Sequence, residues 1–136
     1  MILVDTGPLV ALFDPRDDLH VSCRERLQSF RLPLVTVLPV LTEAFHILAP
    51  ESRGSEALRE FIGRNGMSVH YANDAELARC FELMERYKDH PMDLADAAVV
   101  AAAEALGARK VFTVDRDDFE TYRVRRGHRH YPIEIV

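Results

Sequence analysis

The chain begins with MILVDTG, residues 1–7, in which four apolar residues lead directly into a single carboxylate. A continuous apolar run of this kind is typical of a strand that is buried on both faces of a sheet. An unpaired carboxylate at the end of such a strand is costly to bury. Asp5 therefore either caps the helix that follows, because an aspartate at a helix start accepts backbone N–H bonds, or belongs to a functional site.

The rest of the sequence alternates between strand and helix patterns. Further strands are expected over residues 34–38, 67–72, 110–114 and, at the C-terminus, 131–136. Helices are expected to begin near Pro8 and to cover residues 20–30, 39–48, 55–65, a long segment capped by Asn73 or Asp74, and residues 94–107. Strands separated by helices predict an α/β domain with a mainly parallel sheet and helices on both faces.

Two local details of the helices can also be predicted. Asp17 or Asp18 is expected to cap the helix over residues 20–30. In the long helix after Asn73, one apolar stripe is expected to face the core: Leu77, Cys80, Phe81, Met84 and Tyr87.

The composition limits the class of protein. A chain of 136 residues predicts one domain over residues 1–136, and 48% apolar with 29% charged residues indicates a globular chain, not a disordered one. The net charge of −5 argues against a protein that binds nucleic acid by bulk charge alone. It does not argue against a protein that binds phosphates through a metal ion. Cys23 and Cys80 have no CxxC or zinc spacing and predict reduced thiols. Without a signal or membrane-spanning pattern, a cytoplasmic location with no membrane partner is expected.

A second strand, KVFTV at residues 110–114, repeats the pattern of the first, since it too is followed by an aspartate, Asp115. In an open parallel sheet, ligands bind outside the carboxyl ends of the strands, where the strand order reverses. Asp5 and Asp115 would therefore point into one crevice. The alternative for Asp115 is a cap for a helix over residues 116–122.

Asp96 is the only charged residue in LADAAVVAAA, residues 94–103, and the rest of that helix is apolar on every side. Its carboxylate is expected to be buried with no basic partner on the helix, which favours a bound metal cation. The alternative is that Asp96 assists Asp93 at the helix N-terminus. Asp93 is interpreted first as the N-cap, with a second role as an outer ligand of a metal or water left open.

Glu43 alone would be interpreted as a surface glutamate, but it follows the carboxyl end of the second strand. It therefore completes a set of four candidate carboxylates: Asp5, Glu43, Asp96 and Asp115. Oxygen ligands without Cys or His select Mg²⁺ or Mn²⁺ over zinc. Such a site suits phosphodiester hydrolysis, and the four oxygens are predicted to be able to share one cation. Thr6 and Thr113 offer hydroxyls for ligand support or phosphate contact, although threonine is also a common strand and turn residue.

The motifs VDTGPLVALFD, TEAF, MDLADAAVVAAAEALG and VFTVDRDDF, in this order over the whole chain, resemble the PIN domain family and in particular VapC-type toxin ribonucleases. The resemblance implies a three-layer α/β/α sandwich with a five-stranded parallel sheet and endoribonuclease activity with Mg²⁺ or Mn²⁺. It implies that Asp5, Glu43, Asp96 and Asp115 are the four family acids, with Asp93 as an additional one. It also implies frequent homodimers and an antitoxin partner.

The C-terminal segment TYRVRRGHRHY, residues 121–131, contains arginines and histidines but no acid. Beside the fourth carboxylate, these basic side chains could hold RNA phosphates on either side of the cut; the alternative is a solvated hairpin turn. The candidates are Arg116, Arg123, Arg125, Arg126 and Arg129. His128 and His130 are interpreted as part of the turn, not as metal ligands.

Other functions remain open at this level. A phosphatase or phospho-acceptor with Asp5 as nucleophile usually has a second acid close to the first, which DTG lacks. A PIN-like module that only binds RNA or protein would gain nothing from four clustered carboxylates. A nuclease of RNA processing that is not a toxin fits the same residues.

Overall fold

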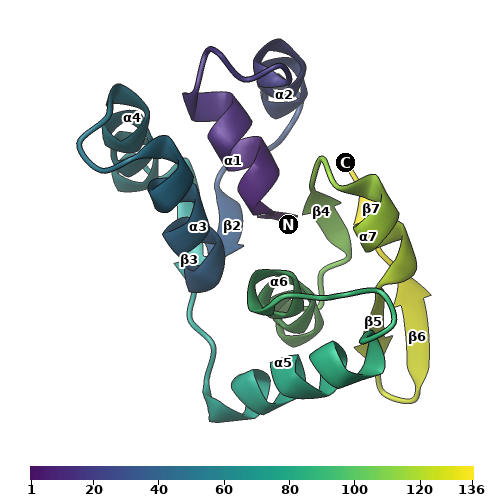
Figure 1. Ribbon diagram of the computed structural model, residues 1–136. Helices are drawn as coiled ribbons and strands as arrows, with labels where there is room; N and C mark the ends of the chain where they lie inside the picture. The colour runs from purple at the N-terminus through teal and green to yellow at the C-terminus, as the bar shows by residue number, and fades with distance from the viewer.

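The computed structural model describes all residues from Met1 to Val136, and its central layer is a five-stranded parallel sheet (Figure 1). The strands, in the order in which they lie in the sheet, are β3 (Met67–His70), β2 (Leu34–Val37), β1 (Ile2–Val4), β4 (Lys110–Phe112) and β7 (Glu134–Ile135). The chain extends the sheet outward from β1 in both directions, so the strand order reverses between β1 and β4. Ligands bind at such reversals, outside the carboxyl ends of the strands.

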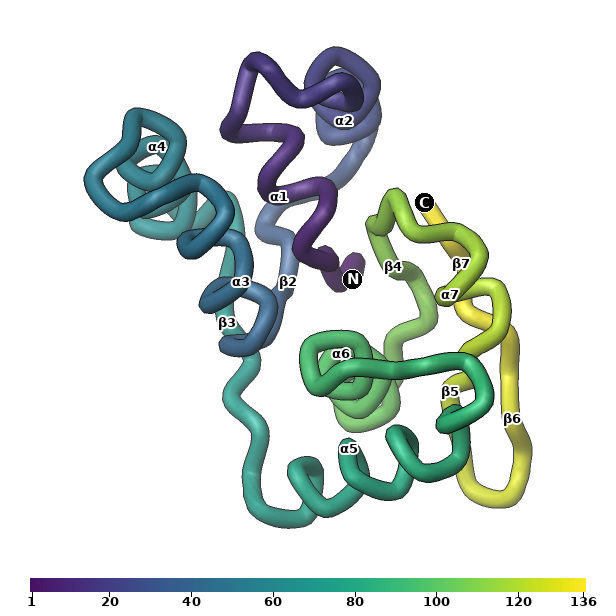
Figure 2. The backbone as a smooth tube through the Cα atoms, in the orientation of Figure 1, coloured from purple at the N-terminus to yellow at the C-terminus, as the bar shows by residue number.

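Helices cover both faces of the sheet, which confirms the predicted three-layer α/β/α fold. The helices are α1 (Thr6–Phe13), α2 (His20–Gln28), α3 (Leu38–Leu48), α4 (Arg53–Gly63), α5 (Asp74–Arg86), α6 (Leu94–Leu106) and α7 (Arg116–Thr121). Figures 1 and 2 show α1, α2 and α4 on one side of the sheet and α5 and α6 on the other. A separate antiparallel hairpin, β5 (Arg123–Arg126) and β6 (Arg129–Pro132), lies beside α6. None of the helices has the length and apolar character needed to cross a membrane.

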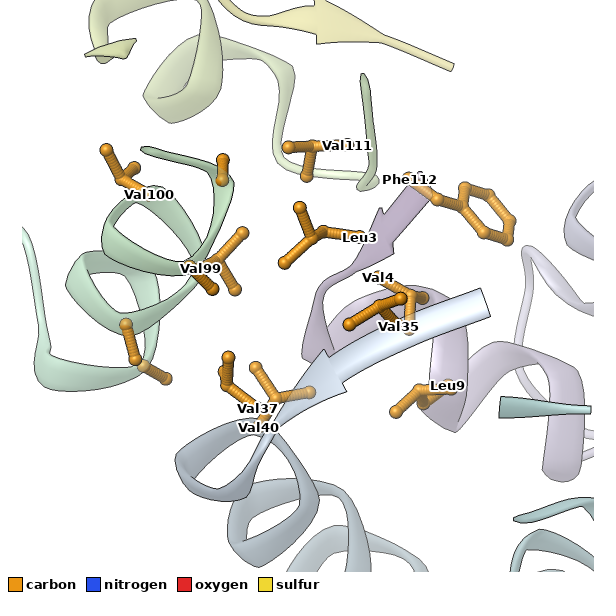
Figure 3. Packing of buried hydrophobic residues seen from close by; sticks show 14 of the residues in the cluster. Leu3, Val4, Leu9, Val35, Val37, Val40, Val99, Val100, Val111 and Phe112 are labelled. Carbon is orange, nitrogen blue, oxygen red and sulfur yellow. The ribbon is translucent and has the colours of Figure 1, made fainter. Parts of the chain in front are cut away.

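The core forms on both faces of the short central strand β1. Leu3 and Val4 are both 0% exposed, and successive strand residues point to opposite faces. Figure 3 shows Leu3 on the side of Val99 in α6 and Val4 on the side of Leu9 in α1. Because both faces are covered, the strand is apolar without alternation, as its sequence predicted.

Several element boundaries differ from the sequence-based predictions. Leu38 opens α3 instead of ending β2, and β4 ends at Phe112, so Thr113 and Val114 form a short connection before Asp115. Proline is tolerated anywhere in the first helical turn, which is why α1 begins at Thr6, two residues before Pro8. The C-terminal segment predicted as one strand divides between β6 and β7.

One predicted detail of the helices is wrong, and the predicted apolar stripe of α5 holds only for Cys80, Met84 and Tyr87, which lie in the core or pack against it. The residue before α2 is Leu19, and the Asp17 carboxylate accepts a bond from the Leu19 backbone instead of capping the helix. In α5, Cys80 and Leu83 are buried, but Leu77 and Phe81 are 42% and 57% exposed. This helix contacts mainly α6, so only a narrow stripe of its surface is covered. The Asn73 cap of α5 is confirmed, and both cysteines are free and buried.

Candidate functional site

The four sequence-predicted carboxylates line one cleft of about 560 Å³ at the carboxyl edge of the sheet, as expected. Asp5 directly follows β1, Glu43 comes from α3, Asp96 from α6, and Asp115 follows the connection after β4. Two further carboxylates line the same cleft, those of Asp93 and Asp118. The fold therefore brings together six acidic side chains from segments that are far apart in the sequence.

Asp5 is the most buried of these carboxylates, with 8% of the residue exposed. It occupies the N-cap position of α1, but its side chain accepts no capping hydrogen bond. Instead, the Thr113 hydroxyl donates to Asp5 Oδ2 at 3.0 Å and accepts from the backbone N–H of Asp115 at 3.0 Å. Burial raises the pKa of Asp5 to about 6. The carboxylate that ends β1 is thus a member of the cleft and not a helix cap.

Asp96 lies in the first turn of α6 and is half-buried, whereas the sequence predicted a fully buried side chain. The reason is its position: the buried stretch of α6 runs from Ala97 to Ala103, and Asp96 precedes it at the cleft. The Tyr122 hydroxyl donates to Asp96 Oδ2 at 3.4 Å. Burial, followed by the neighbouring charges of Asp93, Asp5 and Asp118, raises the pKa of Asp96 to about 7.

Asp93 is the N-cap of α6, as predicted. Its Oδ1 accepts a hydrogen bond from the backbone N–H of Asp96 at 2.8 Å. The capping function is therefore filled by Asp93, which leaves the Asp96 carboxylate free for another role.

Asp115 is both a helix cap and a cleft residue, so the two interpretations of its sequence position hold together. Its Oδ1 accepts a bond from the backbone N–H of Asp118 at 3.4 Å. The two carboxyl groups also share a hydrogen bond that raises the pKa of Asp115 and lowers that of Asp118. On its other side, Asp118 Oδ1 lies 2.5 Å from His90 Nε2, in a hydrogen bond from the loop before α6.

Glu43 and Thr6 also line the cleft. Burial, together with the charge of Asp93, raises the pKa of the half-buried Glu43. The Thr6 hydroxyl lies near enough to Glu43 to lower that pKa, but it is the only buried side-chain polar atom that has no hydrogen-bond partner of good geometry. Buried hydroxyls normally have a partner, so this atom is available to a polar ligand in the cleft.

A model of the PIN domain family matches residues 2–124. This chain belongs to the PIN domain family. Among curated proteins it is similar to "Ribonuclease VapC26" of Mycobacterium tuberculosis, with 29% identity over 132 residues that cover 94% of this chain and 96% of the relative.

Solved structures with the same fold are also known. The M. tuberculosis toxin VapC20, described as cleaving the sarcin–ricin loop, matches with a TM-score of 0.78 and 20% identity over 87% of this chain and 92% of that one. A toxin–antitoxin complex from Klebsiella pneumoniae matches with a TM-score of 0.71 and 19% identity over 89% and 92%. At these identities, the likeness demonstrates the PIN fold.

Three residues of the site of this PIN domain were missed in the sequence: Asp118, which lines the cleft, and His90 and Tyr122, which hydrogen-bond to cleft carboxylates. Asp118 follows Asp115 by three residues, a spacing that places it one turn further along the same helix start, and this signal was present in VDRDDF. His90 and Tyr122 gave no signal, because their roles depend on the packing of the loop before α6 against α7.

The predicted arginines are not all beside the cleft. Arg116 directly follows the cleft residue Asp115 and is exposed. Arg123 Nη1 donates to the backbone carbonyls of Glu120, Thr121 and Tyr122, so it closes the end of α7. Arg126 donates to the carbonyl of Gly107, at the opposite end of α6 from Asp96. The expectation that the whole basic segment flanks the fourth carboxylate is therefore wrong.

The cleft offers a divalent cation suitable ligand chemistry but not a preformed cage. All of the acidic groups are hard oxygen donors, and the pKa values of Asp5 and Asp96 are raised by burial and, to a smaller extent, by neighbouring negative charges, both of which a bound cation would offset. As the side chains stand, however, no three of them are close enough together to surround an ion. Asp5 is bonded to Thr113 and Asp96 to Tyr122 through one oxygen each, so the second oxygen of each carboxylate is free to ligate an ion once the side chains move closer together.

Proposed function

We propose that this PIN domain is a metal-dependent endoribonuclease that hydrolyses RNA phosphodiester bonds, and that it is the toxin of a VapBC-type toxin–antitoxin pair. The observation that carries the proposal is the convergence of four carboxylates from four separate segments on one cleft where the strand order reverses. The similarity to a protein named ribonuclease supports the reaction class. A cleft with this much negative charge attracts phosphates only when cations neutralise it, which supports the dependence on metal.

Asp5, Glu43, Asp96 and Asp115 would hold Mg²⁺ or Mn²⁺, and Asp93 would hold a water molecule or act as an outer ligand. Bound in the cleft, the cation would polarise the phosphate and favour the ionised form of the attacking water. The Thr6 hydroxyl has no partner within the protein and would donate to a phosphate oxygen.

Residues behind the cleft wall would orient these carboxylates. The Thr113 hydroxyl holds Oδ2 of Asp5, and its second bond to the Asp115 backbone ties the two strand ends together. His90 holds Asp118, which in turn bonds to Asp115.

The proposal includes two protein partners and a location. An antitoxin is expected because a structure of the same fold, from Klebsiella pneumoniae, is described as a toxin–antitoxin complex. A homodimer is supported by large apolar side chains exposed near the start of α3, on α5 and at the start of α6, namely Leu38, Leu77, Phe81 and Leu94. Such a group of exposed apolar side chains is unusual on a monomer. A cytoplasmic location follows from the RNA substrate.

The test is cleavage of a panel of structured RNAs by the purified protein with Mg²⁺, with Mn²⁺ and with chelator. We expect defined cuts with either metal and none with chelator. Cleavage that persists in chelator would contradict the metal dependence, and intact RNA under all conditions would contradict the nuclease function. Growth arrest on expression, relieved by the product of a small neighbouring reading frame, would separate a toxin from a nuclease of RNA processing.

A further inference from the structure

We propose that the β5–β6 hairpin is a second RNA-binding surface, which holds the phosphate backbone of the substrate at a distance from the cleft. The substrate class is then a long or folded RNA and not a short oligonucleotide. This inference rests on the proposed nuclease function and extends it from the reaction to the substrate.

The hairpin carries positive charge that the protein itself does not neutralise. Residues 121–131 contain four arginines and two histidines without an acid, in a chain with a net charge of −5. None of the ion pairs in the structure includes an arginine of this segment. Glu104, which lies beside the hairpin, accepts two bonds from the Arg79 guanidinium, at 2.8 and 3.0 Å, and its only hydrogen bond to the hairpin comes from the Arg125 backbone.

The strand register adds to this charge. Arg126 lies directly opposite Arg129, and Arg125 lies opposite His130. The like charges of Arg126 and Arg129, which face each other across the two strands, destabilise the hairpin. Arg125, Arg126, Arg129 and His130 are all exposed. Because this arrangement opposes folding and none of its arginines forms an ion pair within the protein, we infer that it binds an external anion.

The hairpin is held rigidly along α6. Val124 is buried in the core, and the Arg125 backbone N–H donates to Glu104 Oε2 at 2.7 Å. From the other strand, the carbonyl of Pro132 accepts a bond from Arg109 Nε at 3.2 Å. A surface fixed in this way presents its guanidinium groups at a constant distance from the cleft.

That distance follows from the geometry of α6. Strand β5 begins directly after Tyr122, whose hydroxyl bonds to Asp96, and it ends at Arg126, which bonds to Gly107. Gly107 follows Asp96 by eleven residues, which is about 16 Å along the helix at 1.5 Å per residue. At about 3.4 Å per nucleotide in a duplex strand, the separation corresponds to about five nucleotides. An RNA that reaches both the cleft and the hairpin tip must therefore be longer than this.

Arginine favours phosphate as the ligand. The planar guanidinium presents a fork of donors that matches a phosphate group, and the segment contains arginine and no lysine. Because RNA is also the proposed substrate of the adjoining cleft, one ligand accounts for both surfaces. An acidic protein segment is the alternative occupant that the experiment must distinguish.

The test uses the double variant Arg125→Gln/Arg129→Gln in the full chain. These positions leave intact the bonds of Arg123 within α7 and of Arg126 to Gly107, so the fold is preserved. The matched control is Arg24→Gln/Arg59→Gln, which removes two exposed arginines from α2 and α4. Two RNAs are compared in Mn²⁺: a stem-loop of about 30 nucleotides and a four-nucleotide strand with the same cut site, which is too short to span the separation of about five nucleotides.

We expect the hairpin variant to lose about tenfold in kcat/KM on the stem-loop, through KM, and much less on the short strand. The slope of log K against log salt for the stem-loop should become shallower by about 1.5, since two phosphate contacts are lost. The control should change neither. Equal losses on both RNAs, or none on the stem-loop, would overturn the inference.

A failure of the proposed function is distinguishable from a failure of this inference. If the parent cuts no RNA, the nuclease proposal fails, and fluorescence anisotropy of the stem-loop in chelator still decides whether the hairpin binds RNA. If a poly-glutamate peptide binds the parent and loses affinity in the hairpin variant while RNA binding is unaffected, the surface docks an acidic protein segment and the inference is wrong.

Discussion

The substitution Asp96→Asn separates the structural role of this carboxylate from its proposed chemical role. Asparagine has almost the same shape, and its Oδ1 can still accept the bond from Tyr122. The N-cap of α6 is unaffected, because Asp93 provides it. What the substitution removes is a negative charge next to Asp93, Asp5 and Asp118.

The size of the effect on stability follows from the pKa. A rise from 3.8 to about 7 corresponds to about 4 kcal/mol at pH 8, at about 1.36 kcal/mol per pH unit. Asp96 is half-buried, so solvent screening reduces this to about 2 kcal/mol. Without metal, we therefore expect the variant to melt about 8 °C above the parent at pH 8. Its stabilisation by added Mn²⁺ should be largely lost.

Activity should change in the opposite direction. Loss of an anionic ligand is expected to reduce metal-dependent RNA cleavage by at least about a hundredfold. Differential scanning calorimetry and a cleavage assay on the same samples test both effects, with Asp18→Asn, an exposed aspartate between α1 and α2, as the control of equal charge change. Normal cleavage by Asp96→Asn would show that Asp96 is structural. A variant less stable than the parent would refute the electrostatic reasoning.

Three further predictions concern the pH dependence, the cleft and the oligomeric state. Asp5 and Asp96 hold their protons more tightly in the folded protein, so the stability that they contribute is present at low pH and is lost as the pH rises through about 6 to 7. The metal-free protein should therefore melt at a higher temperature at pH 5.5 than at pH 8. A melting temperature that does not change with pH would contradict the raised pKa values. His90→Ala should lower kcat about tenfold because it removes the hydrogen bond that holds Asp118, and His90→Gln should restore part of the activity. Equal rates in the parent and both variants would show that the bond between His90 and Asp118 has no role in orienting Asp115. Phe81→Glu should convert the expected homodimer to a monomer in light scattering, and a parent that is already monomeric at high micromolar concentration would exclude this dimer.

The parts of the fold that were predictable from sequence are those encoded by continuous local patterns. The apolar run before Asp5 defined a central strand, and the apolar helix after Asp93 defined α6 with its cap. Because the carboxyl ends of parallel strands meet at one edge, the grouping of Asp5 and Asp115 followed from topology alone. These inferences needed no knowledge of side-chain packing.

The parts that failed depend on how separate elements pack. The exposure of Phe81 reflects the limited contact of α5 with its neighbours, which an apolar stripe does not reveal. The hairpin arginines lie next to Asp115 in sequence, yet β5 runs along α6 toward Gly107 and away from the cleft. Similarly, Asp118 belongs to an acidic run that is also typical of a solvated helix start, and only its bonds to His90 and Asp115 place it in the site.

The central claim is that the cleft carboxylates bind the divalent cation on which RNA cleavage depends, and Mn²⁺ bound to the crystalline protein tests it most directly. An anomalous difference map should show manganese between Asp5, Asp96 and Asp115, with carboxylate oxygens at about 2.0–2.6 Å. The same map for Asp96→Asn should show a much weaker peak. A fully active protein whose manganese lies outside the cleft, or is absent from it at saturating concentration, would contradict the account.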